Sequence, residues 1–144
     1  MEELKLSNQL CFPLYAASKE VVSKYTPILK RFDLTYTQYI AMLVLFEEKE
    51  MKVTELGERL YLDSGTLSPL LKKLENKGFL RRIRDKNDER NVKISLTEEG
   101  KKIESELVIV PKTIGSCINL SRDESITLYT LLYKLLNNIK DPVL

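Results

Sequence analysis

The chain has 144 residues, the length of one domain, and 43% of them are hydrophobic, which is enough to form a core. Histidine is absent, the two cysteines lie far apart and the five glycines are scattered, so imidazole catalysis, a zinc site and a glycine-rich phosphate loop are all disfavoured. We therefore expect no enzyme, metal ion or cofactor. No apolar run approaches roughly 18 residues and the N-terminus lacks a signal-peptide pattern, which predicts a cytoplasmic protein without membrane contact.

Positive charge is concentrated in the middle of the chain. Between Ser64 and Lys93 there are nine Lys and Arg and four Asp and Glu, so this segment carries +5 and the remainder −3 of the net +2. A basic segment within a mildly acidic chain is typical of proteins that contact phosphate groups. On charge alone, an ordinary solvated surface explains it equally well.

The first predicted helix covers about residues 7–31. Ser7 is expected to cap it, and Pro13 lies inside it. Because proline has no N–H group, we expect the carbonyl of Gln9 to lose its helical partner and the helix to bend beside Cys11.

Three further helices follow at short intervals. Thr35 and Gln38 form a capping box for YTQYIAMLVLFEE, whose heavily apolar surface predicts a central position. Thr54 is expected to cap the short helix ELGERLYL, and either Asp63 or Ser64 to cap GTLSPLLKKLENK.

The hydrophobic period changes after Gly78, which should end the last of these helices. FLRRIR is a plausible strand, and NVKISL alternates with Val92, Ile94 and Leu96 on one face. The charged segment DKNDER lies between them and predicts the tip of a β-hairpin. Two short helices followed by a basic hairpin are typical of a winged helix-turn-helix, a mainly α fold with a small β-hairpin wing.

The second helix of such a module enters the major groove of DNA by its N-terminal residues. Small and hydroxyl side chains there suit phosphates and base edges, lysines can follow the backbone, and arginines on a wing suit a narrow minor groove. We predict DNA contacts from Ser64, Gly65, Thr66, Ser68, Pro69, Lys72, Lys73, Arg82, Arg84, Lys86 and Arg90.

The C-terminal part contains two more predicted helices. Thr97 caps the first, which Pro111 should bend or end, and Ser121 with Glu124 forms a capping box for the second. The second helix carries one apolar stripe, made of Leu128, Leu131, Leu132, Leu135 and Ile139.

These outer helices carry more apolar surface than a small winged module requires. We expect one domain over residues 1–144, with dimerisation helices at about 7–31 and 98–140 and the winged helix-turn-helix at about 35–96. A two-fold dimer would place its recognition helices about 34–36 Å apart, which suits a pseudo-palindromic operator on double-stranded DNA. The alternative is that these helices complete the core of a monomer.

The stretch LGERLYLDSGTLSPLLKKLENKGFLRRIRDKNDERNVKISLTEEG resembles the MarR family of bacterial regulators, and DERNVKISLTEEG resembles that family's wing signature. LCFPLYAASKE, YTQY and LDSGTLSPLLKKLE are similar to the OhrR/SarZ-like subgroup of thiol-based sensors. The resemblance covers almost the whole chain. It implies a homodimeric repressor that leaves its operator when organic hydroperoxide oxidises a cysteine, and a wing in which Asp88 orients Arg90 toward the minor groove.

The resemblance also implies a sensor site. Cys11 matches the reactive cysteine, Tyr25 and Tyr36 match two tyrosines that hydrogen-bond its sulfur across the dimer, and Tyr15 matches a further tyrosine of the pocket. In some members a low-molecular-weight thiol caps the oxidised cysteine, whereas in others a second cysteine near the C-terminal helices forms an intersubunit disulfide. Cys117 lies in about the right region for the second type.

The chemistry of such a sensor is plausible on physical grounds. Peroxides react with the thiolate, and two phenol O–H donors would stabilise negative sulfur without adding a formal charge. Phe12 and Tyr15 would make the entrance apolar, which favours organic hydroperoxides. Two alternatives stay open: a regulator released by a small aromatic ligand, and a thiol peroxidase that uses Cys11. The absent histidine and the basic wing argue against the peroxidase.

Overall fold

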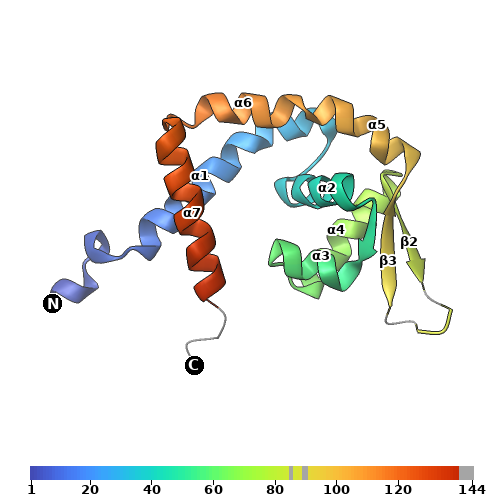
Figure 1. The fold of residues 1–144 in the computed structure, drawn as a ribbon, viewed down its shortest axis with the longest axis horizontal. Coiled ribbons are helices and arrows are strands. Elements are labelled where there is room, and N and C mark those ends of the chain that lie inside the picture. Colours follow the sequence, from blue (N-terminus) through green and yellow to red (C-terminus); the bar gives the residue numbers. More distant parts are fainter. Residues whose placement is uncertain (85, 89–90, 140–144) are drawn as a thin grey trace.

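The computed structural model describes residues 1–84, 86–88 and 91–139, and it is mainly helical with one small antiparallel sheet, as predicted (Figure 1). Three short 3-10 turns occur at Glu2–Leu4, Leu6–Asn8 and Lys30–Phe32. The regular elements are α1 (Cys11–Leu29), α2 (Tyr36–Glu48), β1 (Glu50–Lys52), α3 (Val53–Leu60), α4 (Ser64–Asn76), β2 (Leu80–Arg84), β3 (Val92–Leu96), α5 (Glu98–Leu107), α6 (Ile109–Cys117) and α7 (Arg122–Asn138). No helix in the described part of the chain is both long and apolar enough to cross a membrane.

The sheet has the strand order β1-β3-β2, with both pairs antiparallel. The hairpin of β2 and β3 was predicted, but β1 was not. β1 is three residues long, and Met51, which pairs with Ile94, is its one partly buried residue. So short a segment has no alternation that a sequence pattern could reveal.

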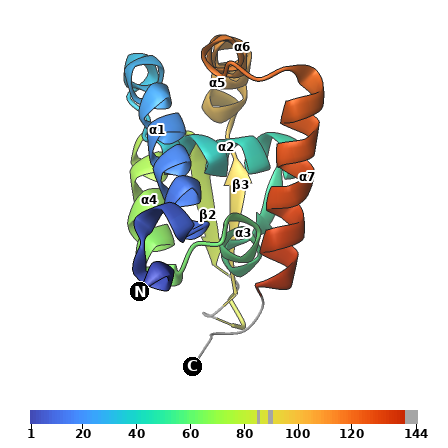
Figure 2. The same ribbon diagram turned by 90° about the vertical axis from the view of Figure 1, so that its left-hand side faces the viewer.

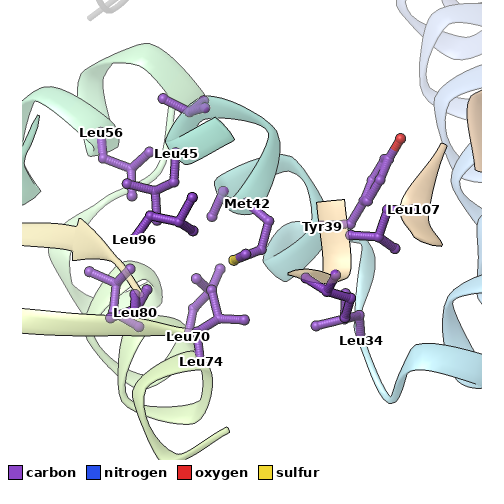
Figure 3. Packing of buried hydrophobic residues seen from close by; sticks show 14 of the residues in the cluster. Leu34, Tyr39, Met42, Leu45, Leu56, Leu70, Leu74, Leu80, Leu96 and Leu107 are labelled. Carbon is purple, nitrogen blue, oxygen red and sulfur yellow. The ribbon is translucent and has the colours of Figure 1, made fainter. Parts of the chain in front are cut away.

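The hydrophobic core is built around α2, whose Met42 and Leu45 face α3, α4 and the sheet, whereas its Tyr39 lies against Tyr25 of α1 (Figure 3). Met42 and Leu45 are fully buried there, together with Leu56 of α3 and Leu74 of α4. Burial of these aliphatic side chains is the main stabilising contribution to the module formed by α2, α3, α4 and the sheet, which we call the winged module.

Both ends of α4 are defined by local hydrogen bonds. At its N-terminus, the Asp63 carboxylate accepts a 2.8 Å hydrogen bond from the Thr66 N–H, so Asp63, one of the two predicted caps, is the cap. At its C-terminus, Gly78 has a φ of 76° and donates to the Glu75 carbonyl at 2.9 Å. Phe79 donates to the Leu74 carbonyl at 3.1 Å, which completes a Schellman motif. The predicted end at Gly78 is confirmed.

Two predictions about α1 are wrong. The helix begins at Cys11, and Ser7 lies in the preceding 3-10 turn instead of capping it. Pro13 is therefore in the first turn of α1, where its missing N–H has no helical partner to lose. The Gln9 carbonyl keeps a partner, because it accepts a 3.3 Å hydrogen bond from the Phe12 N–H.

The predicted cap of α3 is also wrong. This helix begins at Val53, so Thr54 lies inside its first turn. The carboxylate of Glu55 instead accepts a 3.0 Å hydrogen bond from the Lys52 N–H. The side chain of Glu55 thus satisfies a backbone donor that would otherwise be exposed at the helix end.

The other predicted caps are confirmed, since Thr35, Thr97 and Ser121 each accept a hydrogen bond from the first turn of α2, α5 and α7. The predicted break near Pro111 is confirmed as well, because α5 ends at Leu107 and α6 begins two residues later. Proline offers no N–H to the Leu107 carbonyl four residues before it.

The outer helices are arranged differently from the winged module. α1 and α6 pack against each other, whereas none of the 17 residues of α7, all of them described, is buried. α1 and α7 overlap in Figure 1, but they are well separated in Figure 2. α7 therefore exposes its apolar side chains in the single chain.

Candidate nucleic-acid interface and thiol region

The N-terminal half of α4 has two distinct faces. Leu67, Leu70 and Leu71 point into the core and are almost fully buried. The predicted DNA-contacting residues of this helix are all exposed: Ser64, Gly65, Thr66, Ser68, Pro69, Lys72 and Lys73. The helix thus presents small, hydroxyl and basic groups on one side while the leucines anchor the other.

Arg82 is held inside the module by Glu75 of α4. Its Nε lies 2.8 Å and its Nη2 2.6 Å from Glu75 Oε2, and its backbone N–H donates to Glu75 Oε1 at 3.1 Å. Less than a third of either side chain is exposed. The hydrogen bond from Arg82 lowers the pKa of the Glu75 carboxyl, which keeps the pair ionised. The DNA contact predicted for Arg82 stays a prediction, and the observed contact joins β2 of the wing to α4.

The remaining predicted wing residues lie toward the tip of the hairpin. Arg84 ends β2 and is exposed, as are Lys86 and Asp88. The Asp88 carbonyl accepts a 2.9 Å hydrogen bond from the Asn91 N–H. Arg90 lies outside the described residues, and so does the predicted pair between Asp88 and Arg90.

The partnership of Glu75 with Arg82 was missed at the sequence level. An acidic residue seven positions before an arginine, across a turn and a change of secondary structure, belongs to no helix or strand period. Only the Schellman turn at Gly78 brings the two residues together.

Cys11 and Tyr15 lie on the exposed N-terminal turns of α1. Cys11 is its first residue, at the helix end that favours negative charge, and 64% of Tyr15 is exposed. Both cysteines of the chain are free thiols.

Tyr25 and Tyr36 form a pair at the junction of α1 and α2. Their ring centroids are 4.8 Å apart in an edge-to-face arrangement, and Tyr39 lies 5.8 Å from Tyr25. Burial raises the pKa of Tyr25 and of Tyr36, so both phenols remain protonated and can donate hydrogen bonds. This pair has the donors that a thiolate requires.

The structure does not bring Cys11 to these tyrosines within one chain. Cys11 and Tyr25 are fourteen residues apart on the same helix, which corresponds to roughly 21 Å along its axis. A contact between this thiol and these phenols therefore requires a second copy of the chain.

Cys117 ends α6 and lines a small hollow of about 200 Å³ against Glu20, Val21 and Lys24 of α1. This part of α1 is nine to thirteen residues beyond Cys11, or roughly 14–20 Å along the helix. A disulfide requires Cβ atoms about 3.5–4.5 Å apart. Cys11 and Cys117 of one chain are too far apart to form one in this conformation.

A larger hollow of about 810 Å³ lies where α1, α2 and α4 meet. Tyr36 and Gln38 line it together with threonines and lysines, and the ion pair of Asp33 with Lys77 lies at its wall. It can admit a small anionic molecule.

α3 and α4 are two short helices, and α4 has an exposed polar face. An ion pair attaches the three-stranded wing to α4. Together these elements define a winged helix-turn-helix. Residues 23–107 match the family model for the transcriptional regulators SarA and Rot. The HTH-type transcriptional regulator SarZ of Staphylococcus haemolyticus is 47% identical over 133 residues, which cover 92% of this chain and 90% of the relative. The chain belongs to the SarA/Rot family of transcriptional regulators.

Solved structures agree with this assignment. Reduced AbfR bound to DNA, a protein of Staphylococcus epidermidis, is 36% identical with a TM-score of 0.77, and the match covers 97% of this chain and 98% of that one. The disulfide form of AbfR has a TM-score of 0.65 at 35% identity and coverages of 96% and 94%. A MarR mutant of Escherichia coli in complex with operator DNA has a TM-score of 0.79 at 28% identity and coverages of 88% and 93%. SarZ is thus named as a transcriptional regulator, and the reduced AbfR and MarR structures contain DNA.

Proposed function

We propose that this chain is a homodimeric DNA-binding repressor that leaves its operator when an organic hydroperoxide oxidises Cys11. The observation that carries DNA binding is the match over almost the whole chain to AbfR in its reduced, DNA-bound form. The exposed end of α4 would enter the major groove, and Arg84, Lys86 and Arg90 of the wing would reach an adjacent minor groove, with Asp88 orienting Arg90.

A second copy of the chain covers the apolar surface of the outer helices in this proposal. On α7, 57% of Leu131 and 46% of Leu128 are exposed, although leucine is normally buried. Val108 and Ile109, at the junction of α5 and α6, are about half exposed too. We infer that this exposed apolar surface of the outer helices is the site where a second copy binds. The outer helices, at about residues 7–31 and 98–140, would thus form the dimer, and the module at about 35–96 would bind DNA.

The dimer would also complete the sensor. Tyr25 lies roughly 21 Å along α1 from Cys11 of its own chain and Tyr36 packs against Tyr25, so these phenols would serve the thiolate of the other copy. In the first step the thiolate attacks the terminal, hydroxyl oxygen of the peroxide and the O–O bond breaks, which leaves a sulfenic acid. The departing alkoxide takes a proton from water and becomes the alcohol. A second thiol then attacks this sulfur. A disulfide forms between the two sulfur atoms, and water leaves.

The second thiol is either Cys117 of the other copy or a low-molecular-weight thiol. Disulfide formation with Cys117 would pull the outer helices together and shift the attached winged modules, so the spacing on DNA would be lost. The AbfR structures support a change of shape at this step. This chain is less similar to disulfide-formed AbfR than to the reduced form, whereas overoxidised AbfR, with a TM-score of 0.76, is bound to DNA.

A gel shift with and without cumene hydroperoxide tests the proposal. The probe is an operator selected from random duplex DNA by the reduced wild-type protein. We expect peroxide to release the wild type, and we expect Cys11→Ser to bind equally well and to ignore the oxidant. Release of Cys11→Ser at the same dose would contradict the thiol switch, and failure to select any sequence would contradict operator binding.

The same experiment identifies the second thiol. In protein freed of small thiols, disulfide formation with Cys117 predicts a covalent dimer on a non-reducing gel that is lost in Cys117→Ser. That variant should then stay on DNA after oxidation. If wild-type protein stays monomeric on the gel and leaves DNA only when a small thiol is added, the small-thiol route is correct.

The hollow between α1, α2 and α4 favours a second candidate, release by a small aromatic acid. Its volume of about 810 Å³ is ample for one aromatic ring, and lysines on its wall suit a carboxylate. Salicylate titrated into Cys11→Ser bound to operator provides the test. A saturable loss of affinity would support this candidate, and unchanged affinity would exclude salicylate as its ligand.

A further inference from the structure

Thr97 joins the start of α5 to the C-terminal end of α4. As the cap of α5, its hydroxyl accepts a 3.0 Å hydrogen bond from the Gly100 N–H, and it also donates to the Gly78 carbonyl at 2.5 Å. Its backbone N–H donates to the Phe79 carbonyl at 3.1 Å. Gly78 and Phe79 form the Schellman turn that ends α4. A cap requires only the first of these bonds, so the other two are an additional connection between the two helices.

The first turn of α5 lies directly on the backbone of the same Schellman turn. A Cβ atom added at Gly100 would lie 2.1 Å from the Phe79 oxygen and 2.7 Å from a methyl carbon of Leu96, so no larger residue fits without displacing α5. Further along α5, Ile103 and Leu107 are buried in the hydrophobic core. α5, which the sequence pattern placed among the dimerisation helices, is thus fixed along its length to the winged module.

The other end of α5 leads into the outer helices. α6 begins two residues after α5 ends, and it packs against α1 (Figure 1). Movement of α6 would therefore be passed on to α5. Coupling between distant sites is carried by rigid elements in contact with one another. α5 is such an element, and Thr97 is the residue that bonds it to α4.

We propose that Thr97 is a positioning residue for operator binding: its hydroxyl holds α4 to α5, and movement of the outer helices reaches α4 through this contact. The inference rests on the proposed function and adds the residue through which the thiol switch acts on α4. Because α4 is 13 residues long, or roughly 20 Å, a small tilt at its C-terminal end displaces the N-terminal end that would enter the major groove.

Three variants separate this role from capping. Aspartate and glycine are both favourable cap residues, so Thr97→Asp and Thr97→Gly should keep α5, but neither side chain can donate to the Gly78 carbonyl. Since one variant adds a charge and the other does not, an effect shared by both comes from the lost hydrogen bond. Thr97→Ser keeps the hydroxyl and is the matched control.

The measurement is the affinity of the whole chain for the selected operator, before and after oxidation with cumene hydroperoxide. We expect Thr97→Asp and Thr97→Gly to bind about tenfold more weakly when reduced and equally weakly when oxidised, because α4 is no longer held in the position that α5 sets. The ratio of reduced to oxidised affinity should thus fall about tenfold, a common size for coupling between two sites. Thr97→Ser should match the wild type in both states.

A merely structural role of Thr97 predicts other results. General damage to the fold would weaken both states by the same factor and leave the ratio unchanged, and a role in capping alone would leave both variants equal to the wild type. Either result would overturn the inference, as would an effect in only one of the two variants or an equal effect in Thr97→Ser. If the wild type selects no operator, the proposed function fails instead. If it binds but ignores peroxide, the thiol switch fails, and the reduced affinities still test the contact.

Discussion

The winged module and the last helix, α7, differ in how far their apolar residues are buried within one chain. Within the module, α2 is surrounded by α3, α4 and the sheet, and Met42 and Leu45 are completely buried. α7 carries five leucines, yet none of them is buried. The module thus contains most of the core, to which Leu29 of α1 and Leu107 of α5 also contribute, whereas α7 has an apolar surface and no buried residue. The difference teaches that α2 and its neighbours bury their apolar residues within one chain, whereas α7 leaves its own exposed.

The largest effect is expected from a cavity in the module. Leu45→Ala removes a fully buried side chain from the centre of the core and should lower the free energy of unfolding by about 2–5 kcal/mol. Leu43→Ala is the matched control on the same helix, since Leu43 is 38% exposed. Its loss should be clearly smaller. Urea unfolding followed by circular dichroism measures both, and equal losses would mean that α2 is not the centre of the core.

The second effect tests the outer helices. Leu131→Glu places a charge on the apolar stripe of α7 and should weaken a dimer by about 100-fold, because the carboxylate would have to be desolvated at the interface. The helical content of the winged module should be preserved.

Sedimentation velocity at micromolar concentration measures this effect. Thr130→Glu, an exposed polar position of the same helix, is the control and should sediment as the wild type does. If Leu131→Glu and the wild type have the same mass, the stripe is not the interface and the contrast between the two regions is lost.

The parts of the fold that depend on short-range signals could be predicted from the sequence. The capping residues Thr35, Thr97 and Ser121 and the terminating Gly78 act within one helical turn, so their residue types are sufficient evidence. The errors arose where several local solutions compete. Thr54 is a good cap by residue type, but the backbone of Lys52 bonded to Glu55 begins the helix earlier.

The candidate sites were less accessible because they depend on residues distant in sequence. No spacing rule links Tyr25 to Tyr36 across the corner between α1 and α2, and their partnership with Cys11 was suggested by family resemblance alone. The left-handed cap at Tyr61, which ends α3, is equally invisible in a sequence, since tyrosine gives no turn signal.

The third effect concerns the ion pair that attaches the wing to α4. Glu75→Gln leaves the half-buried guanidinium of Arg82 without its carboxylate and should cost about 1–2 kcal/mol of stability at pH 7. Because the pKa of Glu75 is lowered in the folded state, its contribution is present above the unfolded value and is lost as the pH falls through the folded one.

Urea unfolding of both proteins between pH 7 and pH 3 measures this effect. The gap in stability between the wild type and Glu75→Gln should close below about pH 4.5, where carboxyl groups of the unfolded chain take up protons. A gap that persists at pH 3 would assign the loss to packing rather than to charge.

The smallest effect is expected from the ion pair of Arg59, which has the same residue types as the pair of Arg82 and Glu75 but is more exposed. Arg59 of α3 contacts both Glu47 and Glu48 at the end of α2, but 43% of its side chain is exposed. Water solvates these charges in the folded state almost as well as in the unfolded one, so Arg59→Ala should leave the urea midpoint unchanged within error, in low salt and in 0.5 M NaCl alike. A clear loss that disappears in high salt would show that two carboxylates around one guanidinium stabilise the module even at its surface. Burial would then not be what distinguishes the pair of Arg82 and Glu75.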